Sequence, residues 1–165
     1  MAGAWKLPLI VLVENNARAI SVKFEEVSAT PTVAERAPAY AALGWHVDGT
    51  DVMAVWRAAG EVFDHVRAGK GPAILEATCY RFQGHYEGDH DTYRSREERK
   101  RMRAENDPLQ IAERALAAAG HSEEDLAAAR RASHEEAMAL LESVRADPLP
   151  DAADLYRYSL MEDAR

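Results

Sequence analysis

The apolar residues in the first half of the chain form two continuous runs and one helical pattern. The first run, from Leu7 to Val13, is rich in Val and Ile and stops abruptly at Glu14-Asn15-Asn16. A continuous apolar run of this length favours a strand buried on both faces, as in parallel sheets covered by helices. We therefore expect a buried strand over residues 7–16, with its polar end facing the crevice where α/β sheets bind ligands.

The segment after this strand has a mixed pattern. Residues 17–30 predict a loop with a hint of extended structure, and residues 32–43 predict a helix that ends at Gly44 and is disturbed by Pro38. The short stretch Trp45–Gly49 closes with Asp-Gly, which is typical of a brief strand followed by a turn.

The clearest element is a helix with one apolar face. Its apolar residues recur at helical spacing and are Val52, Val55, Trp56, Ala59, Val62, Phe63 and Val66. Thr50 or Asp51 can cap its start, and Gly69 can end it. The second apolar run, Ala73–Tyr80, predicts another strand. This alternation of strands and helices predicts an α/β fold with a parallel sheet flanked by helices.

The second half of the chain changes character at Arg81. Residues 81–94 are glycine-containing and rich in ionisable groups, which predicts an exposed loop directly after a strand. Asp107-Pro108 predicts the start of a helix that Gly120 ends, and Ser122 starts a longer one. Because carboxyl ends of parallel strands share one edge, the loop and the Asn15-Asn16 patch are expected to lie at the same edge.

Composition narrows the possible partners. The chain has 165 residues, 47% hydrophobic and 29% charged, with a net charge of −8, which fits one globular domain of ordinary composition. Nucleic acid is not expected as a partner, because the basic cluster between Arg94 and Arg103 is interrupted by glutamates. No apolar run approaches the length of a membrane span, so no membrane association is expected. The single cysteine, Cys79, is expected to be a buried, inert thiol in a cytoplasmic protein.

Two residues at the predicted sheet edge could carry chemistry. Asn16 offers a hard carbonyl oxygen suited to Mg²⁺, although a plain turn is the more frequent role of paired asparagines after a strand. His85 follows a strand within the loop and could donate to a phosphate or move a proton, although most loop histidines are ordinary surface residues. Glu87, Asp89, His90 and Asp91 form a second candidate metal site, at a spacing that matches neither the metalloprotease helix motif nor an EF-hand loop.

An ordered set of short motifs resembles one enzyme family. They are Trp5–Pro8, Glu14–Asn16, Val47–Asp51, Gly69–Pro72, Tyr80–His85, Tyr93–Glu98 and Asn106–Pro108. Together they resemble the carboxyl-terminal half of the alpha subunit of thiamine-diphosphate-dependent 2-oxo-acid dehydrogenases, a group that includes pyruvate, branched-chain and acetoin dehydrogenases. The resemblance implies a partial thiamine-diphosphate-binding fold in residues 1–105, followed by a helical extension and tail in residues 106–165.

The resemblance also implies a site. Asn16 would give its side-chain oxygen to Mg²⁺, and the backbone carbonyl of Arg18 would be a further ligand. His85 would contact the diphosphate of thiamine diphosphate and assist acyl transfer to lipoyl groups. Residues 86–94 would form a mobile loop over the bound cofactor, which Arg94 helps to fix. The implied partners are a beta subunit in a heterotetramer, a lipoyl-bearing acyltransferase, and a small 2-oxo acid or acetoin.

The chain departs from the family pattern in two places. The family's Gly-Asp-Gly, which holds a further Mg²⁺ ligand, does not occur in these residues, and Tyr86 stands where mitochondrial members carry a regulatory serine. We therefore expect about half of one cofactor site, very weak binding of thiamine diphosphate to the isolated chain, and no decarboxylation by it. A non-catalytic remnant that keeps the fold and a subunit-contact surface is the alternative.

Overall fold

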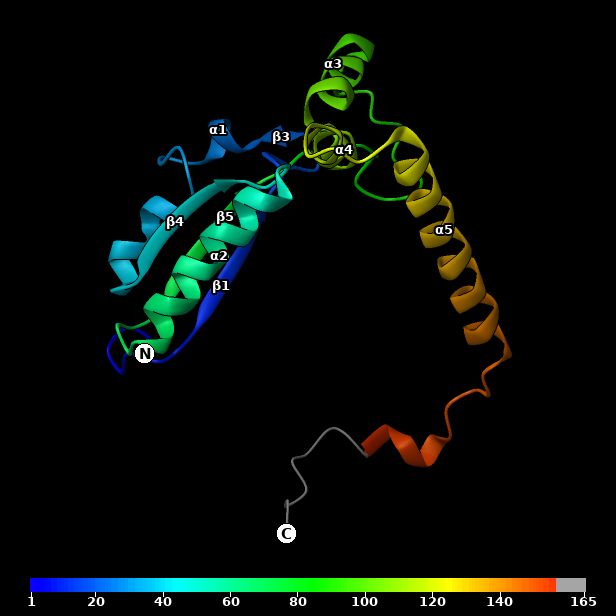
Figure 1. The fold of residues 1–165 in the computed structure, drawn as a ribbon. Helices are drawn as coiled ribbons and strands as arrows, with labels where there is room; N and C mark the ends of the chain where they lie inside the picture. The colour runs from blue at the N-terminus through cyan, green and yellow to red at the C-terminus, as the bar shows by residue number, and fades with distance from the viewer. Residues whose placement is uncertain (157–165) are drawn as a thin grey trace. The chain divides into compact units, whose positions relative to one another are not determined.

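The computed structural model of the chain describes residues 1–156 in two compact units, residues 1–119 and the described part of residues 120–165 (Figure 1). The first unit holds a parallel sheet in the order β1-β5-β4, formed by Ile10–Asn15, Ala73–Thr78 and Leu43–Asp48. The predicted α/β fold with a parallel sheet flanked by helices is confirmed.

One face of this sheet packs on helix α2, Val52–Arg67. The core consists of buried apolar side chains from α2 and β5, namely Ala58, Val62, Val66, Ala73 and Leu75. Asp51 rather than Thr50 caps the helix, because its carboxylate accepts from the backbone N–H groups of Met53 and Ala54 at 2.8 and 3.1 Å. The periodicity of the sequence predicted this helix correctly, because apolar residues spaced three and four apart lie on one face of a helix but on both faces of a strand.

The prediction that the first strand is buried on both faces is wrong. β1 begins at Ile10 rather than Leu7 and is an edge strand, with Val11 44% and Leu12 58% exposed. The strand buried on both faces is the central β5, in which residues 73–77 are all buried. Burial on both faces requires a neighbouring layer on each side, and an edge position at β1 leaves part of its surface without one.

The other face of the sheet packs against a 3₁₀ helix that is shorter than the helix predicted for residues 32–43. Residues 34–40 form the 3₁₀ helix η1, Ala34–Tyr40, and Gly44, predicted to end a helix, lies inside β4. A Cβ on Gly44 would lie 2.2 Å from the carbonyl oxygen of Ala34. The glycine therefore serves the close approach of η1 to the strand rather than a helix end.

Short elements occupy the segment predicted as a loop after β1. A hairpin of two two-residue strands, β2 (Arg18–Ala19) and β3 (Val22–Lys23), leads into the four-residue helix α1, Phe24–Val27. Helices α3, Arg96–Asn106, and α4, Pro108–Ala118, complete the first unit. Asp107 caps α4 through the N–H of Leu109 at 3.0 Å, which confirms the start predicted from Asp107-Pro108.

The second unit contains helix α5, Glu123–Ala146, and the 3₁₀ turn η2, Ala152–Tyr156. Ser122 and Asp125 form a capping box at the start of α5, which confirms the start predicted at Ser122. No residue of α5 is buried. No helix in the described part of the chain combines the length and apolarity needed to cross a membrane. The domain boundary between residues 105 and 106 stays a prediction.

Candidate functional site

The two asparagines at the end of β1 build a turn. The side-chain oxygen of Asn15 accepts from the N–H of Ala17 at 2.9 Å, and that of Asn16 accepts from the N–H of Arg18 at 3.1 Å. Ala17, which follows Asn16, adopts the left-handed region, with φ of 59°. The turn is therefore present, as expected of paired asparagines after a strand. A carbonyl oxygen can accept two bonds, so Asn16 Oδ1 keeps a lone pair for a further donor or a cation.

A buried carboxylate lies behind this turn. Glu76, in the middle of β5, has no exposed surface. Its Oε1 accepts from Asn15 Nδ2 at 2.6 Å, and its Oε2 accepts from the backbone N–H of Ala34 at 2.7 Å. In the register of the sheet, Val13 and His46 stand beside Glu76, and Asn15 stands beside Thr78. The contact between Asn15 and Glu76 is thus diagonal across one face of the sheet.

A cleft of about 670 Å³ opens at the carboxyl ends of the three strands. Strand-end residues lining it are Asn15, Asn16, His46, Asp48, Glu76 and Thr78, and residues from the following segments include Arg18, Lys23, Phe24, Glu98 and Met102. His46 Nε2 and Thr78 Oγ1 lie 2.7 Å apart across its floor. The volume falls within the range of small-molecule sites, about 300–1,000 Å³. The cleft lies where open α/β sheets bind ligands.

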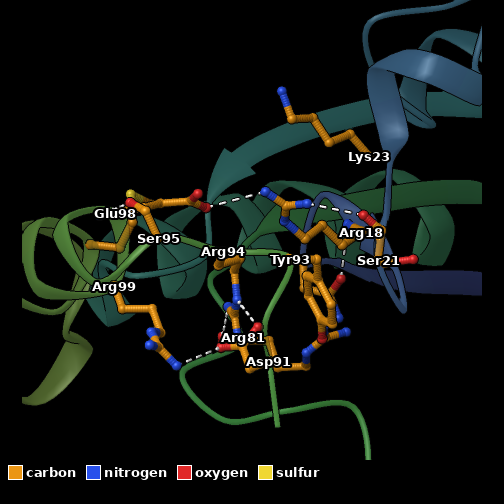
Figure 2. Close-up of polar contacts among 12 residues, drawn as sticks. Arg18, Ser21, Lys23, Arg81, Asp91, Tyr93, Arg94, Ser95, Glu98 and Arg99 are labelled. Atoms are coloured by element: carbon orange, nitrogen blue, oxygen red, sulfur yellow. Dashed lines mark hydrogen bonds and ion pairs between the residues drawn. The ribbon is translucent and has the colours of Figure 1, made fainter. Parts of the chain in front are cut away.

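Arg18 occupies one wall of the cleft, and Figure 2 shows its guanidinium between two acceptors. It donates to the backbone oxygen of Ser21 at 3.1 Å and forms an ion pair with Glu98 of α3 at 3.2 Å. Its side chain is only 13% exposed. The guanidinium also lies over the ring of Tyr93, 5.9 Å from the centroid, so it joins the turn to the loop at residues 81–94.

The loop is held by a buried ion pair. Arg94 and Asp91 form a bidentate pair with distances of 2.6 and 2.5 Å, and their side chains are 1% and 6% exposed. Arg94 donates further to the backbone oxygens of Arg81 and Gln83. The predicted exposed loop is therefore exposed only in part. The hydrogen bond from Arg94 lowers the pKa of Asp91.

A second group of polar contacts closes the loop around Asp89. Its carboxylate accepts from the N–H of His85 at 2.7 Å, the hydroxyl of Tyr93 at 2.7 Å and the N–H of Asp91 at 2.9 Å. These bonds, that from the N–H of His85 first among them, lower the pKa of Asp89 to about 2. Burial and the bond to Asp89 raise the pKa of Tyr93. Arg81 donates to the Tyr93 hydroxyl at 2.6 Å and to the backbone oxygen of Ile20 at 2.9 Å, which attaches the loop to the hairpin.

The structure brings only some of the predicted site residues together. Asn16 and Arg18 both line the cleft, whereas His85 and Arg94 are not among its lining residues. His85 is exposed, with only its backbone N–H committed to Asp89. The guanidinium of Arg94 is committed to loop acceptors. Arg94 is thus placed to fix the loop.

The second candidate metal site is not supported. Within residues 1–156, no group of three or more histidine, cysteine, aspartate or glutamate side chains is arranged to hold a metal ion. Asp89 and Asp91 instead accept hydrogen bonds that shape the loop. The alternating acidic spacing reflects loop construction rather than metal binding.

Cys79 also differs from its expectation. It lies just beyond the end of β5, is half-buried, and lines the cleft. Burial, and then the nearby charge of Glu14, raise the pKa of its thiol. The thiol therefore stays protonated at neutral pH, in line with the expected inert behaviour.

Comparison with known proteins assigns the family. Residues 1–153 match the model of the dehydrogenase E1 component. The chain belongs to the dehydrogenase E1 component family.

Similar proteins within the dehydrogenase E1 family carry two kinds of name. The chain is 38% identical over 157 residues to a pyruvate dehydrogenase E1 component subunit alpha of Rhizobium meliloti, a match covering 94% of this chain and 45% of that protein. It is 41% identical over 110 residues to the alpha subunit of an acetoin:2,6-dichlorophenolindophenol oxidoreductase of Bacillus subtilis, covering 67% and 33%. The chain therefore spans less than half the length of these relatives.

Glu76 is the site residue of this dehydrogenase E1 family member that sequence reasoning missed. Its signal was available, because it is the one charged residue in the apolar run Ala73–Thr78. A carboxylate inside a buried strand needs hydrogen-bond donors from neighbouring elements. Which donors supply them, Asn15 and Ala34, depends on the pairing of the strands and the position of η1.

Proposed function

We propose that this chain forms the carboxyl-terminal part of the alpha subunit of a thiamine-diphosphate-dependent dehydrogenase. The assembled enzyme would decarboxylate a 2-oxo acid, or cleave acetoin, and transfer the acyl group to lipoamide. The observation that carries the proposal is the family match over residues 1–153, with the Asn15-Asn16 turn at the mouth of a cleft of suitable size.

The residues present fit a divalent cation in part. Asn16 Oδ1 and the backbone carbonyl of Arg18 are hard oxygen donors, the type that Mg²⁺ prefers. They belong to one short turn that lines the cleft, where Arg18 and Lys23 are ion-paired with Glu98 and Glu25. We propose Asn16 and Arg18 as ligands of Mg²⁺, and the cleft as the place of the diphosphate of the cofactor. When bound, thiamine diphosphate would supply the chemistry that cleaves the carbon–carbon bond next to an oxo group.

The loop residues would act at the mouth of the site. His85 is exposed on a loop fixed by Asp89 and Arg94, and we propose that its imidazole contacts the diphosphate or an incoming lipoyl group and gives or takes a proton there. Arg94 would act by holding the loop. Arg81, through its bond to Ile20, would keep the loop beside the cofactor turn.

The partners follow from the names of the relatives, which are alpha subunits. We propose a beta subunit, assembly into a heterotetramer, and a lipoyl-bearing acyltransferase as the acceptor of the acyl group, in a cytoplasmic enzyme. The exposed apolar residues Val11 and Leu12 on the edge strand support further polypeptide at this side of the sheet. Whether the substrate is pyruvate, a branched-chain 2-oxo acid or acetoin would be set by the assembled enzyme.

The test is a chimeric alpha subunit. The amino-terminal part of the Rhizobium meliloti relative is placed before Met1 of this chain and co-produced with the beta subunit of that relative. We expect an assembled complex that reduces an artificial acceptor with at least one member of a panel of 2-oxo acids and acetoin, dependent on thiamine diphosphate and Mg²⁺. His85→Ala should remove transfer to lipoamide.

The matched control is the relative's own alpha subunit produced in the same way. A chimera that assembles to the same size as this control, yet turns over no substrate of the panel, would contradict the enzymatic function. That result would favour the alternative of a non-catalytic remnant that retains subunit contacts.

A further inference from the structure

We propose that Glu76 is a positioning residue that holds the Asn15-Asn16 turn, through the side chain of Asn15, in the geometry that binds Mg²⁺. This inference rests on the proposed function, because it assigns a role at the same site. Glu76 itself would touch neither metal nor cofactor.

The burial of Glu76 calls for a physical reason. It lies in the central strand with no exposed surface, between apolar neighbours such as Leu75 and Ala77. Removing a carboxylate from water costs several kcal/mol unless donors replace its hydration. An apolar residue would pack the same strand without this cost. What Glu76 adds is two fixed acceptor oxygens on the cleft side of the sheet.

Each oxygen has one short hydrogen bond from a different element. Asn15 Nδ2 donates to Oε1 at 2.6 Å from the end of β1, and the N–H of Ala34 donates to Oε2 at 2.7 Å from the start of η1. Bonds to an ionised acceptor are stronger than those between neutral groups. The carboxylate therefore ties β1 and η1 to the central strand at the floor of the cleft.

The contact with Asn15 also fixes which way its amide points. An ionised carboxylate only accepts, so Asn15 must present its NH₂ group to Glu76. Its oxygen then faces the N–H of Ala17, from which it accepts at 2.9 Å. Ala17 lies between the two residues proposed as Mg²⁺ ligands and holds a positive φ of 59°. A chain of two hydrogen bonds thus links Glu76 to the backbone of the metal-binding turn.

The decisive experiment reverses the donor and acceptor roles of these hydrogen bonds in the chimeric complex. In Glu76→Gln, the new NH₂ group faces one of the two donors that Glu76 accepts from, either Asn15 Nδ2 or the N–H of Ala34. If the Asn15 amide flips to accept from this NH₂ group, its own NH₂ group then faces the N–H of Ala17. Every arrangement therefore places two donors face to face. In the double variant Glu76→Gln with Asn15→Asp, the side-chain amide at position 76 donates to the carboxylate at position 15. The N–H of Ala17 keeps an acceptor in that carboxylate, and the N–H of Ala34 keeps one in the amide oxygen at position 76. All three bonds return with the same net charge.

The first readout is the dissociation constant of Mg²⁺, measured by calorimetry at saturating thiamine diphosphate. We expect Glu76→Gln to weaken Mg²⁺ binding about tenfold, the scale of lost outer-sphere support at metal sites. The double variant should recover to within about threefold of the starting protein, as a restored network predicts. Glu61→Gln, the same change at an exposed position of α2, should leave binding unaltered.

The second readout needs no bound cofactor. Amide hydrogen exchange at Ala17 in the 165-residue chain should speed up in Glu76→Gln and return in the double variant. Asn15→Ala removes the link at a partly exposed position and keeps the experiment informative if Glu76→Gln does not fold. It should weaken Mg²⁺ binding to a similar degree, about tenfold.

The outcomes separate this inference from the function on which it rests. A starting chimera without Mg²⁺-dependent binding of thiamine diphosphate would overturn the proposed function and this inference with it. Normal binding by the starting chimera, with Mg²⁺ affinity unchanged in Glu76→Gln or in Asn15→Ala, would overturn the positioning role alone. Loss of thermal stability without any loss of Mg²⁺ affinity would also overturn the positioning role, because it would show a purely structural role.

Discussion

The two polar segments that follow β1 and β5 lie at the same edge of the sheet but are built differently. The Asn15-Asn16 turn is shaped by neutral amides over one buried carboxylate, and its residues line the cleft. Residues 81–94 are held by charged side chains, with Arg94 and Asp91 buried as a pair. The turn keeps oxygen atoms available for a ligand, whereas the loop uses most of its charges on itself and leaves His85 exposed. A charge-rich segment is therefore not by itself a binding site.

The largest effect on the loop is expected from Arg94→Ala. Removing one partner of a buried ion pair leaves the other charge without compensation, at a cost of about 3 kcal/mol. We expect the free energy of opening of the loop to fall by about this amount, seen as faster amide exchange at His85 and Asp91, both of which donate to Asp89.

Arg99→Ala is the matched control. Arg99 approaches the same carboxylate at 3.6 Å but is 37% exposed, so its removal should cost less than about 0.5 kcal/mol. Equal effects of the two substitutions would show that the loop is not organised by the buried pair.

A smaller effect is expected from Gly44→Ala, which tests the contact between β4 and η1. The new Cβ would lie 2.2 Å from the carbonyl oxygen of Ala34, so η1 must move away from β4. Overpacking of this kind costs about 1–3 kcal/mol in the free energy of unfolding. Urea denaturation should show this loss, and the loop amides at residues 85 and 91 should exchange as before.

Gly60→Ala gives the opposite sign in the same assay. Position 60 lies within α2, and an added Cβ would meet nothing within 4 Å. Alanine in a helix interior is favoured over glycine by about 0.5–1 kcal/mol, so this variant should be more stable. A destabilisation equal to that of Gly44→Ala would contradict the close-approach explanation.

The smallest effect concerns acid. The pKa of Asp89 is lowered from 3.8 to about 2 in the folded loop, so its ionised form stabilises the fold. That stabilisation is fully present above pH 3.8 and is lost as the pH falls through about 2. The amide chemical shifts of His85 and Asp91 should follow this titration. A midpoint at or above 3.8 would contradict the network, and Asp89→Asn should abolish the transition.

Local patterns predicted most elements correctly. The spacing of Val52 to Val66 determined α2, and Asp107-Pro108 and Ser122 marked the starts of α4 and α5. These signals are local because a helix satisfies its own hydrogen bonds and shows its apolar period directly. The paired asparagines likewise predicted a turn, and both make the expected bond to the backbone two residues on.

The site could be predicted only in part. Asn16 and Arg18 were located by sequence motif, and the structure places them together in the cleft. The place of His85 outside the cleft lining was not predictable, since the loop that carries it takes its shape from Asp89, Tyr93 and Arg94. The use of Gly44 for close approach, rather than for ending a helix, was hidden because it depends on where η1 lies against β4.

The family, the helices and the polar nature of the strand ends can be derived from the amino-acid sequence. The edge position of β1 and the central position of β5 emerge only in the folded chain, because strand order depends on long-range pairing. The fold also decides that Glu76 reaches Asn15 and Ala34, which lie 61 and 42 residues away along the chain. A buried carboxylate needs donors, but only the folded sheet brings these two to it.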